Sequence, residues 1–68
     1  NSMKRMFKYF LAFESEDSSK TVAEFNSHEE CQAFKKELDE KGLSNQLVNE
    51  RESQALQYKG ASYLDMKD

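Results

Sequence analysis

The chain has 68 residues and a net charge of −3, with 37% hydrophobic, 34% charged and 12% aromatic residues. This composition is typical of a globular domain and excludes a disordered or low-complexity chain. At this length we expect one domain over residues 1–68 with a small hydrophobic core. Asn1 and Ser2 precede the first methionine, so we interpret residues 1–2 as a cloning remnant.

The single cysteine cannot form an internal disulfide, which favours a reducing compartment, and we expect a cytoplasmic protein. The chain opens with basic residues followed by apolar ones, as signal peptides do. Its uninterrupted apolar run, Tyr9 to Phe13, is too short for that role. No segment is apolar over the roughly 20 residues needed to cross a bilayer, so we expect no membrane partner.

Residues Met3 to Glu14 alternate in the manner of a β-strand. The odd positions are nearly all apolar and are predicted to face a helix. The even positions mix apolar with charged residues, so the second face of this strand is half hydrophobic. The odd set includes Phe7, Tyr9, Leu11 and Phe13, and the even set includes Lys4, Met6, Lys8, Phe10 and Ala12.

A polar stretch over residues 15–20, SEDSSK, predicts a loop, and Thr21 to Asn26 follows as a short second strand. The two strands are expected to form a hairpin. From Gln46 to Arg51 a weaker third strand is predicted. The first strand is apolar on both parities and is the best candidate for the centre, which predicts the strand order 2-1-3.

A helix is predicted between the hairpin and the third strand. Ser27 is a favourable N-cap, and Glu30 is placed to complete a capping box with it. Gly42 can adopt the left-handed conformation that ends a helix, and Leu43 can then fold back onto Leu38. The apolar stripe of this helix comprises Cys31, Phe34 and Leu38.

The segment from Ser53 to Met66 has two interpretations. Leu56 and Tyr58 alternate as in a strand, with a turn at Lys59 and Gly60, and we favour this interpretation. The alternative is a short helix capped by Ser53 and ending at Gly60. The predicted fold is therefore α+β, a small, mainly antiparallel three- or four-stranded sheet with one helix on one face, in the order ββαβ(β).

No residue pattern indicates catalysis or a cofactor site. Cys31 lies in the first helical turn but on the apolar stripe, so we expect a buried small hydrophobic residue. His28 has no second histidine or cysteine partner for zinc, and the acids of the loop lack the spacing of a calcium-binding loop. The chain carries no phosphate-binding, dinucleotide-binding or nucleophile motif. We therefore expect no enzyme activity, no cofactor, no metal and no small-molecule substrate.

The even face of the first strand is the candidate binding surface, because one helix covers only one side of a sheet. An alternative is that the C-terminal segment folds over it through Leu56, Tyr58, Tyr63 or Leu64. The leading hypothesis is a small non-enzymatic module that binds another protein as an inhibitor, adaptor or regulator, or binds a second copy as a homodimer. Its size and acidity also suit accessory proteins of phages and mobile elements. The residues predicted to contact the partner are Lys4, Met6, Lys8, Phe10 and Ala12.

The alternative hypothesis is a nucleic-acid-binding module that uses the first strand. Residues 1–13 carry a charge of +3, whereas the rest of the chain carries −6. Basic residues interleaved with aromatic ones can hold phosphates while rings stack on bases. The acidic remainder of the chain would repel phosphate, which makes this the second choice.

Overall fold

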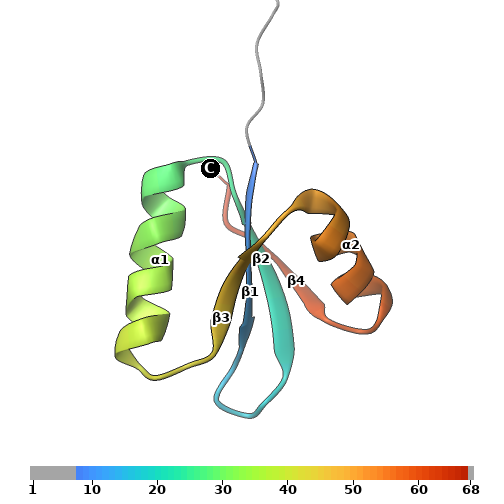
Figure 1. Cartoon of the computed structure of the whole chain (residues 1–68), viewed down its shortest axis with the longest axis horizontal. Coiled ribbons are helices and arrows are strands. Elements are labelled where there is room, and N and C mark those ends of the chain that lie inside the picture. Colours follow the sequence, from blue (N-terminus) through green and yellow to red (C-terminus); the bar gives the residue numbers. More distant parts are fainter. Residues whose placement is uncertain (1–7, 68) are drawn as a thin grey trace, which may run out of the picture.

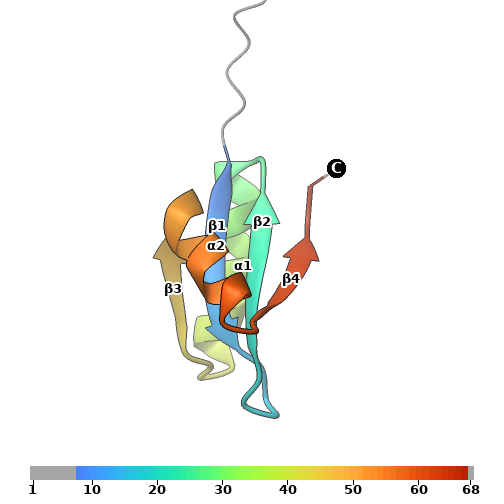
Figure 2. The same cartoon turned by 90° about the vertical axis from the view of Figure 1, so that its right-hand side faces the viewer.

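A computed structural model describes residues 8–67 of the chain. In chain order they form β1 (Tyr9–Glu14), β2 (Lys20–Phe25), α1 (His28–Glu40), β3 (Asn45–Val48), α2 (Glu50–Tyr58) and β4 (Ser62–Asp65). The strands form one sheet in the order β3-β1-β2-β4, in which β1 is antiparallel to β2 and β3, and β4 is parallel to β2. Helices α1 and α2 lie on opposite faces of this sheet (Figures 1 and 2). The predicted α+β class and the order of the first three strands are confirmed.

The β1–β2 hairpin is built as the alternation predicts. Leu11 is paired with Ala23 at its centre, and both side chains are fully buried on the face that α1 covers. Cys31 and Leu38 of α1 pack onto them, together with Phe25. Burial of these side chains is the main source of stability in a domain this small. The half-buried residues around this core are Tyr9, Phe13, Phe34, Leu43 and Met66. Phe7, also predicted for this face, lies outside the described residues.

Helix α1 begins and ends where the sequence predicts. The Ser27 hydroxyl accepts a hydrogen bond from the backbone N–H of Glu30 at 3.3 Å, and it donates to Glu29 Oε1 at 3.1 Å. The acid that turns back to the N-cap is therefore Glu29, where the capping-box prediction had Glu30. At the other end Gly42 has φ +72°, and the N–H of Leu43 donates to the carbonyl of Leu38 at 2.9 Å.

The strand predicted over residues 53–66 is wrong for its first part, because residues 50–58 form α2. Asn49 is the N-cap: its side chain accepts from the Glu52 N–H at 2.7 Å, and the Glu52 carboxylate accepts from the Asn49 N–H at 3.1 Å. Because α2 starts directly after this N-cap, β3 ends at Val48, three residues before the predicted end at Arg51. Past Gly60, which has φ +111°, the predicted C-terminal strand is present as β4. The fold thus gains a second helix on the face that the sequence left open.

No helix within residues 8–67 is both long enough and apolar enough to cross a membrane.

Candidate binding surface

The surface predicted on β1 is changed by α2. Lys4 and Met6 lie outside the described residues. Phe10 is only 6% exposed and Ala12 is half-buried, because α2 packs over this face against β1 and β2. The predicted exposure of Phe10 is therefore wrong, and the alternative in which the C-terminal segment covers this face describes it better.

Lys8 is the one predicted surface residue that is both described and exposed. Its Nζ lies 3.7 Å from Oε2 of Glu50 in the first turn of α2, in an exposed ion pair of the kind that contributes about 0–1 kcal/mol. Phe10 is the aromatic residue on the predicted binding face of the first strand, so the nucleic-acid hypothesis requires its ring to be exposed for stacking on bases. Its burial removes that stacking surface from the described part of β1.

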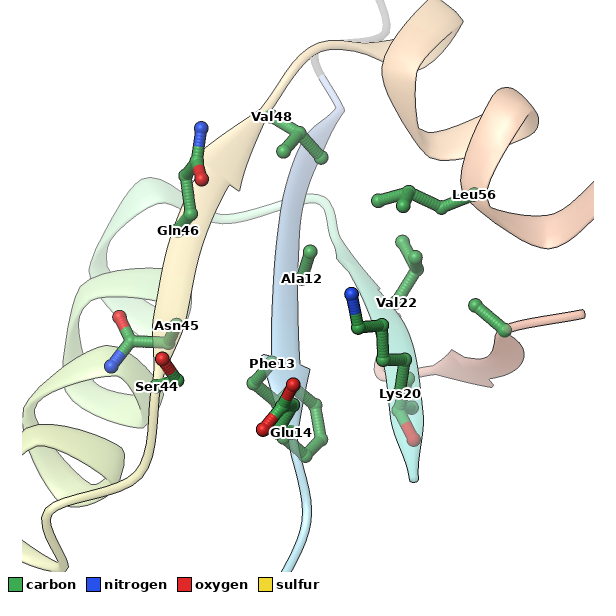
Figure 3. Close-up of a pocket in the computed structure, with 12 residues that line it drawn as sticks. Ala12, Phe13, Glu14, Lys20, Val22, Ser44, Asn45, Gln46, Val48 and Leu56 are labelled. Carbon is green, nitrogen blue, oxygen red and sulfur yellow. The ribbon is translucent and has the colours of Figure 1, made fainter. Parts of the chain in front are cut away.

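A shallow groove remains beside α2 (Figure 3). Its floor is apolar and includes Ala12, Val22 and Leu56, and Figure 3 shows Leu56 reaching from α2 toward the sheet. Its volume is about 190 Å³, below the roughly 300–1,000 Å³ typical of sites that enclose a small ligand. Polar side chains at its margin come from Glu14, Lys20, Ser44 and Gln46.

Asp17 of the hairpin loop stabilises the turn. Asp17 accepts hydrogen bonds from the N–H of Ser19 at 3.0 Å and from its hydroxyl at 2.7 Å, and these bonds lower the pKa of Asp17. Ser18 takes a positive φ of 70° in the same turn. Among residues 8–67, no three His, Cys, Asp or Glu side chains are grouped as metal ligands.

Cys31 is 1% exposed, which confirms the prediction that it is a buried small hydrophobic residue. Burial raises the pKa of its thiol against a smaller opposing effect of Lys35, so the reactive thiolate is disfavoured. His28 is exposed at the start of α1 and packs edge-on against Tyr9, with ring centroids 5.5 Å apart.

Strand β4 is the most open element of the sheet. It is a terminal strand, and all four of its residues are exposed. Tyr63 is 45% and Leu64 40% exposed, and they project to opposite faces. Figure 2 shows β4 at the margin of the sheet, with no other described element outside it. This edge combines large apolar side chains with backbone groups that no other described strand pairs.

The backbone of β4 divides its hydrogen-bonding groups between two sides. Glu24 is paired with Asp65, and the N–H of Met66 donates to the carbonyl of Glu24 at 2.9 Å. Alternate residues of a strand direct their N–H and C=O groups to opposite sides. Those of Leu64 and Met66 therefore face β2, whereas those of Tyr63 and Asp65 face away from the sheet.

A buried carboxylate anchors this edge to the sheet. Glu24 is 6% exposed; the Tyr63 phenol donates to its Oε1 at 2.6 Å, and Lys67 Nζ lies 3.2 Å from its Oε2. The Lys67 contact is an ion pair without hydrogen-bond alignment. Burial raises the pKa of Glu24, but Tyr63, Lys67 and the more distant charge of Lys8 outweigh it, so the pKa is lowered.

The burial of Glu24 and the edge position of β4 were not predicted from the sequence. Glu24 lies two residues after Val22 in β2, so both side chains are on the same face of the sheet as Phe10. A carboxylate on a strand that is otherwise buried was the available signal. The edge position of β4 had no such signal, because it depends on a parallel pairing with β2 across 40 residues of chain.

Comparison of the chain with models of known protein families, with curated proteins and with solved structures found no match, so the candidate surface is judged on its own geometry.

Proposed function

We propose that the chain is a small non-enzymatic protein-binding module, of the class of inhibitors, adaptors and regulators, and that it binds by adding a strand at β4. The observation that carries the proposal is the open edge of β4, with exposed Tyr63 and Leu64 beside outward-facing backbone groups. Strand addition takes its affinity from backbone hydrogen bonds and its specificity from alternate side chains. The β4 edge offers both.

Two features favour a folded partner or peptide strand over a small ligand or nucleic acid. The groove beside α2 is smaller than most ligand-enclosing sites, and the second hollow, about 490 Å³ between the hairpin loop and α1, is more open to solvent than this groove. The Phe10 ring of β1, which nucleic-acid binding would use for stacking, is buried, and Lys8, just before β1, is paired with Glu50. A protein strand makes the better match to a sheet edge.

The proposal is tested by a pull-down from lysate of the source cell, with and without nuclease. The tag belongs at the N-terminus, because β4 lies close to the C-terminal end of the sequence. A Leu64→Glu variant places a charge on the proposed edge. Leu47→Glu is the matched control, because Leu47 is 46% exposed in β3, the opposite terminal strand.

We expect a protein captured in stoichiometric amount that survives nuclease, is retained by Leu47→Glu and is lost with Leu64→Glu. Recovery that disappears after nuclease would replace the proposal with nucleic-acid binding. A protein captured equally by both variants would show that binding does not use β4.

A further inference from the structure

The open side of β4 carries a short, defined set of hydrogen-bonding groups. Tyr63 and Asp65 each direct one N–H and one C=O away from β2, as the bond from Met66 to Glu24 establishes. Beyond the two ends of the strand, the neighbouring N–H groups are already used. Ala61 donates its N–H to the carbonyl of Leu56 at 3.0 Å, and Lys67 donates its N–H to Asp65 Oδ1 at 2.9 Å.

This set is self-complementary when two copies of β4 run antiparallel about a two-fold axis at Leu64. Tyr63 of each copy then lies opposite Asp65 of the other. Residues directly opposite in such a pair exchange both of their backbone hydrogen bonds. All four outward groups of each copy are thereby satisfied, and no group that is already bonded is needed.

The two adjacent registers fit less well. An axis at Tyr63 would place Asp65 opposite Ala61, whose N–H is already bonded to Leu56. An axis at Asp65 would place two carboxylates opposite each other, which is destabilising, and would require the N–H of Lys67. Only the axis at Leu64 avoids both conflicts.

The side chains agree with the axis at Leu64. Leu64 would meet Leu64 of the second copy in a non-hydrogen-bonded pair, where Cα atoms approach to about 4.5 Å. The leucine is 40% exposed on the face of α1, beside the half-buried Met66. On the other face, Tyr63 would lie beside Asp65 of the second copy, so no like charges are directly opposed.

We propose that the strand that occupies the β4 edge is β4 of a second copy of this chain, paired antiparallel about Leu64 to form a continuous eight-stranded sheet. This inference rests on the proposed function and names its partner. Such pairing closes on itself, so it yields a dimer and not a filament. A contact centred on one four-residue strand is small beside the roughly 1,200–2,000 Å² of stable interfaces. We therefore expect a dimer that dissociates on dilution.

The opposite terminal strand, β3, is less suited to this pairing. The Asn45 side chain is tied to Lys35 and Asp39 of α1 by hydrogen bonds of 2.7 Å each, so α1 approaches the β3 edge. β3 has one exposed large apolar side chain, Leu47, whereas β4 has two adjacent ones, Tyr63 and Leu64. This difference makes β3 the internal control.

The register is tested by crosslinking the full chain with single cysteine substitutions under mild oxidation. Leu64→Cys would place two thiols next to each other at the axis. The expected Cα separation of about 4.5 Å lies within the roughly 4.4–6.8 Å that a disulfide spans. Ser62→Cys is the matched control on the same strand and face; its two copies would lie about 13 Å apart along the strands. Leu47→Cys is the control on β3. The native Cys31 is buried and is present in all three variants, so its contribution to crosslinking is the same in each.

We expect a covalent dimer with Leu64→Cys and none with the two controls. In parallel, sedimentation of the unmodified chain is expected to show twice the 8.0 kDa monomer mass at high concentration, lost with Leu64→Glu and kept with Leu47→Glu. A monomer at every concentration, a Leu64→Cys variant that gives no covalent dimer, or a dimer that only the Leu47 variants alter would overturn the self-pairing. If the chain is monomeric yet captures a different protein through Leu64, this inference fails while the proposed function stands. If neither occurs, both fail.

Discussion

The phenol of Tyr63 in β4 donates a 2.6 Å hydrogen bond to the buried carboxylate of Glu24 in β2. It joins residues 39 positions apart and fixes an exposed edge strand to the interior of the sheet. Lys67, which follows β4, forms an ion pair with the same carboxylate, with its Nζ 3.2 Å from Glu24 Oε2. The edge is therefore held in place although α1 and α2 leave its residues exposed.

Removing the phenol tests this anchor. Tyr63→Phe leaves the ring but deletes the donor to Glu24, and hydrogen bonds to charged groups contribute about 1.5–3 kcal/mol. Because Tyr63 is 45% exposed, we expect the lower part of that range as the loss in free energy of unfolding, measured in urea. Tyr58→Phe is the control, since Tyr58 is 94% exposed. Equal stability of both variants would contradict the anchoring role.

The same carboxylate predicts a pH dependence. The pKa of Glu24 is lowered in the folded chain from its ordinary value of 4.5, since the hydrogen bond from Tyr63 and the ion pair with Lys67 outweigh burial. The ionised form thus stabilises the fold fully above about pH 4.5, and this contribution is lost as the pH falls through the folded pKa. Melting temperatures across this range should fall on acidification, and less steeply in Glu24→Gln. Identical slopes would show that Glu24 is not the group responsible.

Phe10 is a core residue in the structure. Its burial under α2 means that Phe10→Ala should cost about 3–5 kcal/mol, a large part of the stability of a domain this small. The measurement is thermal unfolding, with the exposed Leu47→Ala as a control. A melting temperature that does not change for Phe10→Ala would mean that α2 does not cover this face.

Substitution of the N-cap of α2 is a second test of whether α2 forms on this face of the sheet. Asn49→Ala removes the side chain that accepts from the Glu52 N–H, and losses of this kind cost about 0.5–2 kcal/mol. We expect a lower midpoint in urea for Asn49→Ala, and little change for Gln54→Ala, an exposed position of α2. If the two variants behave alike, the capping box does not stabilise the helix.

Local signals in the sequence were sufficient for the first half of the fold. Ser27 and Gly42 mark the ends of α1 through their own side-chain and backbone chemistry. The alternation that includes Tyr9, Leu11 and Phe13 defined the face of β1 that α1 covers. These features depend on neighbours in the chain, so they can be predicted without the structure.

The second half depended on contacts between distant residues. The Asn49 and Glu52 capping box was present in the sequence, but the alternation of Leu56 with Tyr58 favoured a strand there. In the structure Leu56 is half-buried against the sheet and Tyr58 is exposed, as two residues on different sides of a helix can be. The binding surface predicted on β1 was wrong at Phe10 for the same reason, because α2 covers this residue.

The most direct test of the β4 edge is amide hydrogen exchange at Tyr63 and Asp65, measured residue by residue by NMR. We predict fast exchange of both amides in dilute solution, because their N–H groups face away from β2, and slow exchange of the Leu64 amide. At high protein concentration, or with the captured partner, both amides should become protected while that of Leu47 in β3 does not. If Tyr63 and Asp65 exchange slowly in dilute monomer, or stay unprotected under all of these conditions, β4 is not the binding edge.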